Sequence, residues 1–342
     1  MLDHPLRIVG APGSPYSRKL RAVLRYRRIP FVWINHGSPE SRGLPQARVQ
    51  LLPQLIVAAA DGGLEARTDS TPLIRELEAR YPSRSVIPVD KALAFIDALL
   101  EDYADEWLTK AMFHYRWAHA ADIANAAAIL PRWFRTDQPE EAAVAAGAMF
   151  AERQVGRLAV VGSNPTTAAV IEESYVRLLH LLDAHLTGSR FALGSRPASC
   201  DFGLFGQLTQ LVGFDPTPAA LAHQHAPRVV AWVDVAEDLS GLEPQERDWT
   251  PRDAVPDTLR ALLAEVGRVY VPFLLANAAA LQHGAERVEC RIDGRPWTQR
   301  PFPYQGKCLG WLREHYAALA DDERASVDAL LAGSGCEPLV AA

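Results

Sequence analysis

The pattern of hydrophobic and polar positions divides the first 85 residues into short strands and helices. Three runs of β-forming residues predict strands, at 6–9, 31–34 and 54–57. Apolar residues recur at helical spacing within 17–27, between the first two runs. An Asp-Gly pair at 61–62 predicts a hairpin turn, and 69–72 has the composition of a helix start. This order, β-α-β followed by β-β-α, predicts a thioredoxin-like α/β domain.

The pattern changes to long helical periodicity from residue 91 onward. No β alternation is found between 91 and 250, which predicts an all-helical (all-α) domain. The remaining segment is mainly helical but contains a predicted hairpin around Asp293-Gly294. We therefore expect a thioredoxin-like domain at 1–85, an all-helical domain at 91–250 and a C-terminal extension at 251–342. The extension is either a flap across the helical domain or an interface element.

Composition and charge exclude some classes of binding partner. The 342 residues include 35 basic and 41 acidic side chains, a net charge of −6 that argues against a nucleic-acid partner. Residues 1–85 are nonetheless basic, with 13 Lys and Arg against 7 Asp and Glu. This excess suits a small anionic ligand, although an uneven solvated surface would also explain it. No apolar run approaches the ~20 residues of a membrane span, so we expect no membrane partner.

Four cysteines lie far apart in the sequence, at positions 200, 290, 308 and 336. Their spacing gives neither a disulfide framework nor a cysteine-rich zinc site. With no signal-peptide pattern at the N-terminus, this favours a reducing compartment, the cytoplasm.

The turn before the first predicted helix carries the most informative chemistry. Backbone N–H groups at a helix start, with a hydroxyl beside them, stabilise an anion such as a thiolate. The first and fourth turn residues are Ser14 and Ser17, so dithiol exchange is excluded here. Lowering the pKa of a free thiol by about two units takes roughly 2.7 kcal/mol, within reach of one charge-assisted hydrogen bond plus the helix terminus. Alternatively, both serines only cap the helix.

Three segments together resemble the N-terminal domain of the glutathione S-transferase superfamily, namely 14–19, 52–55 and 69–71. The resemblance extends over about residues 1–245. It implies a cis peptide bond before Pro53, which holds the backbone of Leu52 for pairing with the cysteinyl group of glutathione. It also implies that Asp69 and Ser70 bind the γ-glutamyl end.

The resemblance implies glutathione as co-substrate, a small apolar electrophile as second substrate, a homodimer and a role in detoxification. The position of Ser14 favours it as the catalytic residue, and Tyr16 is the alternative candidate. The residues implied to contact glutathione are Ser17, Gln50, Leu52, Pro53, Asp69 and Ser70. Arg18 or His36 would assist Gln50 at the glycyl carboxylate, although side chains of these types are more often solvated on the surface.

The electrophile would bind between the domains, against the first helices of the second. Phe113, Tyr115 and Trp117 stand in the right segment, and core packing is the alternative for each. His114 and His119 are five residues apart, off one helical face, so we expect no metal. Ala198 replaces the capping hydroxyl of the superfamily's second domain, so either Ser199 caps that helix or the capping box is half made.

Two other functions compete with a transferase. A non-catalytic module of the same fold would use the extension to contact a partner, because fold does not fix function. Glutathione-dependent reduction would need a cysteine at position 14 and is disfavoured.

Overall fold

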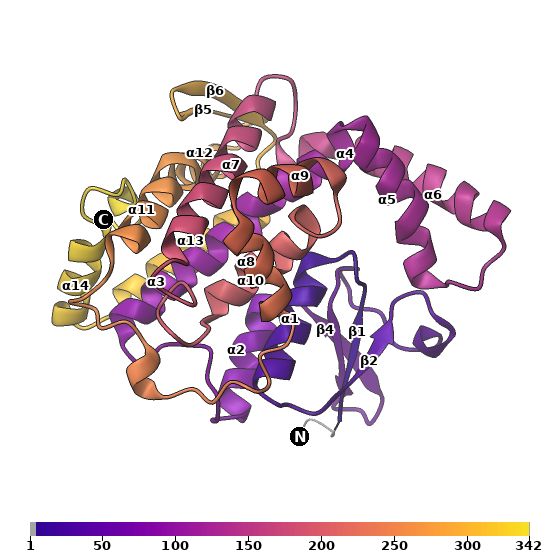
Figure 1. The fold of residues 1–342 in the computed structure, drawn as a ribbon, viewed down its shortest axis with the longest axis horizontal. Coiled ribbons are helices and arrows are strands. Elements are labelled where there is room, and N and C mark those ends of the chain that lie inside the picture. Colours follow the sequence, from indigo (N-terminus) through magenta and orange to yellow (C-terminus); the bar gives the residue numbers. More distant parts are fainter. Residues whose placement is uncertain (1–4, 342) are drawn as a thin grey trace.

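The computed structural model describes residues 5–341, and its first part is a four-stranded sheet in the order β2-β1-β3-β4. The strands are β1 (Leu6–Gly10), β2 (Phe31–Asn35), β3 (Gln54–Ala58) and β4 (Leu64–Thr68). β1 and β2 are parallel, whereas β1–β3 and β3–β4 are antiparallel. The helices α1 (Pro15–Tyr26) and α2 (Ser70–Arg80) pack against each other beside this sheet (Figure 1). The predicted thioredoxin-like fold is confirmed.

Local chemistry explains how these elements begin and end. Pro15 stands at the first position of α1, where its missing N–H costs nothing. Gly62 has φ +84° in the turn between β3 and β4, a conformation that favours glycine. The peptide bond between Leu52 and Pro53 is cis, as predicted.

The middle of the chain is helical, as predicted. Its helices are α3 (Lys91–Tyr103), α4 (Thr109–Ala118), α5 (Ala120–Phe134), α6 (Glu140–Val155), α7 (Ala168–His185), α8 (Ser199–Leu211), α9 (Pro216–His225) and α10 (Pro227–Ala236). A π-helical segment, Ala104–Leu108, joins α3 to α4 without a break.

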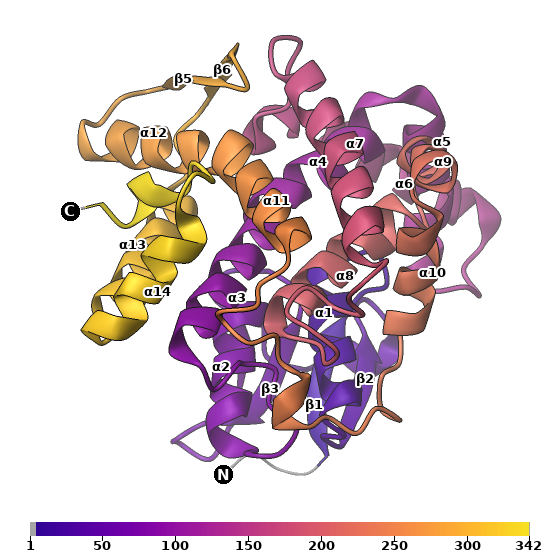
Figure 2. The ribbon, with the colours of Figure 1, turned by 60° about the vertical axis from the view of Figure 1, so that its left-hand side comes forward.

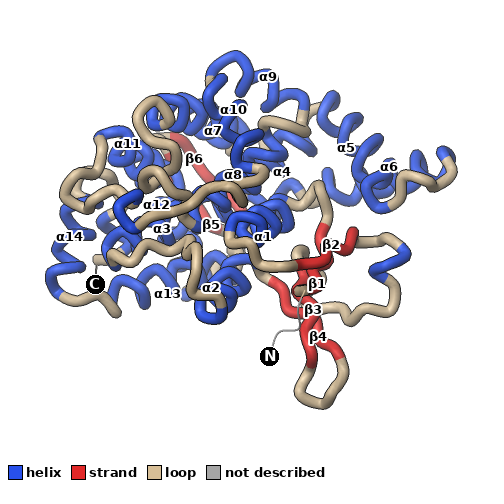
Figure 3. The backbone as a smooth tube through the Cα atoms, turned by 60° about the horizontal axis from the view of Figure 1, so that its bottom comes forward, coloured by secondary structure: helices blue, strands red, loops and turns tan. Residues whose placement is uncertain are grey.

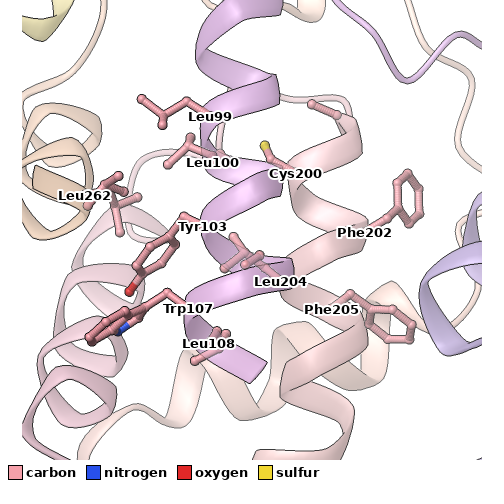
Figure 4. Packing of buried hydrophobic residues seen from close by; sticks show 14 of the residues in the cluster. Leu99, Leu100, Tyr103, Trp107, Leu108, Cys200, Phe202, Leu204, Phe205 and Leu262 are labelled. Carbon is pink, nitrogen blue, oxygen red and sulfur yellow. The ribbon is translucent and has the colours of Figure 1, made fainter. Parts of the chain in front are cut away.

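Helices α3 and α8 form the centre of the hydrophobic core (Figure 4). Tyr103 and Trp107 point to one side of this pair, whereas Phe202 and Phe205 point to the other. Phe202 meets Tyr26 of α1 with ring centroids 5.7 Å apart. The first and second parts of the chain therefore share one core.

The extension consists of α11 (Asp257–Glu265), a π-helical segment (Val266–Tyr270), α12 (Val271–Gln282), β5 (Val288–Ile292), β6 (Arg295–Gln299), α13 (Pro303–Ala317) and α14 (Asp321–Leu331). Helices α13 and α14 pack along α3, as Figure 2 shows. The two-stranded hairpin of β5 and β6, predicted from its Asp-Gly turn, is separate from the main sheet (Figure 3). Within residues 5–341 no helix is long and apolar enough to cross a membrane.

Candidate functional site

The start of α1 is built around two serine hydroxyls. Ser14 is the N-cap residue, and its Oγ accepts a hydrogen bond from the backbone N of Ser17 at 3.2 Å. The Ser17 hydroxyl accepts from the backbone N of Ala11 at 3.3 Å and is fully buried. Ser14 is half-buried. Because its oxygen acts as acceptor within the turn, its own O–H is left to donate to a ligand.

Side chains of the helical part hold this turn in place. Arg116 of α4 donates to the carbonyl of Gly13 at 3.2 Å, and Gln210 of α8 donates to the carbonyl of Pro12 at 3.2 Å. A Cβ at Gly13 would come within 2.8 Å of the Leu130 side chain of α5. This close approach between α5 and the turn explains why residue 13 is a glycine. The two hydrogen bonds make the position of Ser14 depend on the helical part.

A cavity of about 390 Å³ lies in the cleft between the first part, the π-helical segment and the extension. Leu52, which precedes the cis-proline, and both residues of the Asp69-Ser70 pair line it, and we call these three residues its polar wall. The lining also includes the apolar side chains of Val49, Leu51, Val160, Val161 and Phe302. Tyr16 lines the cavity, whereas Ser14 lies outside its lining. The structure thus brings Tyr16, Leu52, Asp69 and Ser70 together.

Asp69 has an unexpected partner in the extension. The hydroxyl of Tyr304, on α13, donates to Oδ2 of Asp69 at 2.7 Å. Burial raises the pKa of Asp69 above its usual range, while the Tyr304 hydrogen bond and the Lys19 charge act in the opposite direction. Asp69 itself has φ +84°, directly before the first residue of α2. The carboxylate implied to bind an ammonium group is therefore already hydrogen-bonded.

Tyr304 also separates this cavity from a second one, of about 450 Å³, between α2, α3 and α13. Both cavities are lined by Asp105, Glu106 and Tyr304. The second cavity carries Arg75 and His315 on its walls, together with the buried thiol of Cys308. The two cavities are therefore neighbours that share these three residues.

Hydrogen bonds to the π-helical segment and to α4 hold the Tyr16 phenol in place. Its hydroxyl donates to the backbone carbonyl of Asp105 at 2.9 Å and lies 3.3 Å from the hydroxyl of Thr109. Burial raises the pKa of Tyr16 well above its ordinary value, and the nearby Glu106 and Asp105 charges add to the rise. The phenol therefore stays protonated with its hydrogen committed to a carbonyl. Of the two predicted donors to a thiolate, the uncommitted hydroxyl is that of Ser14.

Two buried groups beside Tyr16 have pKa values near neutrality. Burial, reinforced by Asp102 and Asp105, raises the pKa of Glu106 to about 8. Burial lowers the pKa of Lys110 to about 7, with Glu106 acting in the opposite direction. Titratable groups with strongly shifted pKa values that line one cavity are typical of functional sites. Neither residue was found from the sequence, because burial alone distinguishes them from ordinary helix-surface charges.

Beneath the cleft, a buried ion-pair network joins α1 to α3. The ammonium of Lys19 lies 2.6 Å from Oε1 of Glu101 and also contacts the carboxylate of Asp105. Burial lowers the pKa of Lys19, but the two carboxylates outweigh it and the net pKa is raised. Thr71, at the start of α2, accepts from Lys19 at 2.9 Å and donates to Asp105 at 3.1 Å. The network therefore fixes the helix that carries Ser14 and the one that carries Ser70.

The residues predicted to line the electrophile pocket do not line this cavity. Tyr115 and Trp117 are buried in the packing of the helical part, and Phe113 is partly buried against them. The cavity is instead lined by Thr109 and Lys110, one turn earlier on α4. These residues therefore follow the alternative, core packing, because α4 turns its later residues toward α5 and α7.

The side chains predicted for the glycyl carboxylate are dispersed. Gln50 is exposed outside the cavity lining, between Val49 and Leu51, which line it. Arg18 pairs with Glu237 at 3.2 Å. His36 packs against Phe134, with ring centroids 5.8 Å apart. The structure therefore gathers none of these three at the cleft.

Two further expectations can be compared with the structure. His114 and His119 come together with Glu172, contrary to the reasoning from their spacing.

At α8, Asp201 accepts from the backbone N of Ala198 at 2.8 Å, and the Ser199 hydroxyl donates instead to Asp97 at 2.6 Å. The capping box is therefore half made.

Comparisons with known proteins address the first part of the chain directly. Residues 8–85 match the model of the glutathione S-transferase N-terminal domain. No curated protein matches the sequence.

Among solved structures, the chain resembles a glutathione S-transferase from Methylobacterium radiotolerans in complex with glutathione sulfonate. The identity is 17%, the TM-score 0.39, and the match covers 73% of this chain and 94% of that one. A glutathione transferase from Burkholderia graminis with two glutathione molecules bound per subunit has 17% identity and a TM-score of 0.42, and the match covers 68% of this chain and 87% of that one. One from Pseudomonas putida with glutathione disulfide bound has 16% identity and a TM-score of 0.41, and the match covers 69% of this chain and 92% of that one. The matched N-terminal model, the sheet topology and the cis-proline agree, and residues 8–85 therefore form an N-terminal domain of the glutathione S-transferase type.

Proposed function

We propose that the protein is a glutathione transferase that joins the glutathione thiolate to a small apolar electrophile. One observation carries the proposal: a single cavity is lined both by Leu52, Asp69 and Ser70 and by a set of apolar side chains. The polar wall suits the peptide part of glutathione, since the start of α2 presents backbone N–H groups to a carboxylate. The apolar side chains suit a hydrophobic second substrate.

Ser14 holds the thiolate in this proposal. Its hydroxyl donates to the sulfur, and the N-terminus of α1 adds a favourable partial charge. The thiolate then attacks the electrophilic carbon, forming the C–S bond as the leaving group departs with its electron pair. Because Ser14 lies outside the cavity lining, the sulfur must extend beyond the lined cavity to meet it.

The test is Ser14→Ala, compared with Ser326→Ala on the remote helix α14. We expect Ser14→Ala to lower the rate with an aryl halide about tenfold to a hundredfold and to shift its pH profile to higher pH. Ser326→Ala should change neither. Full rate with an unshifted profile in Ser14→Ala would remove the role given to Ser14.

A second candidate is a non-catalytic module, and the bond between Tyr304 and Asp69 favours it. In that case the extension fills the γ-glutamyl site with its own hydroxyl. Calorimetry at millimolar glutathione separates the two functions, because only the transferase binds the tripeptide. The absence of any heat of binding would select the non-catalytic function.

We propose in addition that the protein acts in the cytoplasm as a homodimer, as the superfamily resemblance implies. The described cysteines, all free thiols, suit a reducing compartment. Light scattering after size exclusion tests the dimer against the chain mass of 37.5 kDa.

A further inference from the structure

Three metal-ligating side chains from separate elements converge on one point outside the cleft. Nε2 of His114, on α4, lies 3.0 Å from Oε1 of Glu172, on α7. Nε2 of His119, between α4 and α5, lies 3.1 Å from the same oxygen. All three ligand atoms lie within 4.8 Å of one another. We propose that His114, His119 and Glu172 bind a divalent transition-metal ion of the zinc type.

The break between α4 and α5 creates this arrangement. Helix α4 ends at Ala118, and His119 is extended with φ −106° and ψ 133°. The chain therefore changes direction, and the two imidazole rings, five residues apart, meet with centroids 5.5 Å apart. Tyr115 stacks on the His119 ring at 5.4 Å and holds its orientation. A continuous helix would have placed these histidines on different faces.

Hydrogen bonding explains only part of the cluster. His114 and Glu172 have hydrogen-bond geometry through Nε2 and Oε1. Nε2 of His119 is shielded from solvent and makes no hydrogen bond with any residue that the structure describes, although Oε1 of Glu172 is near. An imidazole nitrogen in this state needs a further partner. An ion between the three ligand atoms would satisfy it.

The two nitrogen–oxygen separations suit an ion of this size, and the two imidazole nitrogens lie within 4.8 Å of each other. Zinc lies about 2.0–2.2 Å from imidazole nitrogen and carboxylate oxygen, so tetrahedral ligands are separated by about 3.3 Å. The separations of 3.0 and 3.1 Å need to open by only a few tenths of an ångström. Glu172 is a side chain with 38% exposure, so it has room to make this adjustment.

A hydroxyl orients the most buried ligand. Nδ1 of His114 lies 2.7 Å from Oγ of Ser163, in the loop before α7. When Nδ1–H donates to this oxygen, the lone pair of Nε2 faces the cluster, as the outer partners of metal-bound histidines require. His119 and Glu172 are each about one-third exposed. Two histidines and one carboxylate therefore leave an open side for water or another ligand.

The experiment uses the full-length protein after dialysis against a chelator. His119→Gln and Glu172→Gln each replace one partly exposed ligand, and His180→Gln is the matched control. His180 meets His225 with ring centroids 5.1 Å apart but belongs to no such three-ligand group among the described residues. Zinc binding is measured by calorimetry without glutathione, and cobalt binding by its visible absorption bands.

We expect the wild type and His180→Gln to bind one zinc ion per chain and to gain thermal stability from it. The affinity should fall at least tenfold in His119→Gln and in Glu172→Gln. Thermal melts of the metal-free variants show whether each still folds. Wild-type affinity in His119→Gln, or no zinc binding by the wild type, would overturn the proposal. Neither result bears on the glutathione site.

Discussion

At the scale of single residues, the hydrogen bond between Tyr304 and Asp69 affects how strongly the polar wall of the cavity can bind a ligand. The hydroxyl of Tyr304 donates to the same carboxylate that the superfamily resemblance assigns to an ammonium group. An incoming γ-glutamyl group must displace this donor or share the carboxylate with it. Tyr304 therefore competes with glutathione in the proposed function.

Tyr304→Phe tests this competition while leaving the ring in place. Removing one hydrogen bond worth about 0.5–1.5 kcal/mol, or more to a charged group, should tighten glutathione binding about threefold to tenfold. Titration calorimetry gives the dissociation constant. Trp311→Phe is the control, because Trp311 packs on the Tyr304 ring without touching Asp69. Weaker binding by Tyr304→Phe would mean that the hydroxyl contacts glutathione rather than competes with it.

At the scale of elements, the close approach of α1 and α8 holds the start of α1 against the helical part. Gly206 makes this approach possible, because a Cβ there would come within 2.5 Å of the carbonyl oxygen of Pro15. A backbone oxygen cannot move aside as a flexible side chain can. The two helices meet directly beside the turn that carries Ser14.

Gly206→Ala should therefore force α1 away from α8. We expect a loss of about 1–3 kcal/mol in the free energy of unfolding, the usual range for overpacking, and a lower transferase rate because the start of α1 moves. The matched control is Gly310→Ala in α13, which has nothing within 4 Å of the added methyl group and should gain up to about 1 kcal/mol from helix propensity. Urea denaturation measures both. A Gly206→Ala protein as stable as the wild type would contradict this account of the interface.

The same elements show what the sequence can and cannot predict. The Asp-Gly turns, the helical spacing within 17–27 and the helix start at 69–72 are local signals, and the structure confirms the elements they predicted. Tyr304 reaches Asp69 across 235 residues, and no local pattern encodes that distance. Likewise the spacing of His114 and His119 was misleading because the helix break between them depends on tertiary packing. The cleft was predictable at its polar wall and not at the wall that the extension supplies.

At the scale of the whole molecule, a set of buried carboxyl groups should govern stability against pH. Burial raises the pKa of Glu106 to about 8 and those of Asp102 and Asp201 to about 7. In the unfolded chain such groups titrate near pH 4. Between about pH 5 and 7 the native protein therefore holds protons that the unfolded chain has released. Because stability falls with pH wherever the native state binds more protons, these three carboxyl groups should lower the free energy of unfolding across this window.

Glu106→Gln isolates one member of this set. The variant removes one of the extra native protons, so between pH 5 and 7 its stability should fall less steeply than that of the wild type, by about 1.4 kcal/mol per pH unit. Above pH 7 the lowered pKa of Lys110 acts in the opposite direction, because the unfolded chain then binds the extra proton. Glu314→Gln, an exposed change on α13, is the control and should leave the slope unaltered. Chemical denaturation at several pH values gives the slopes directly. Equal slopes for Glu106→Gln and the wild type would show that the Glu106 carboxyl is ionised in the folded protein, and the cavity in the cleft would then carry its negative charge.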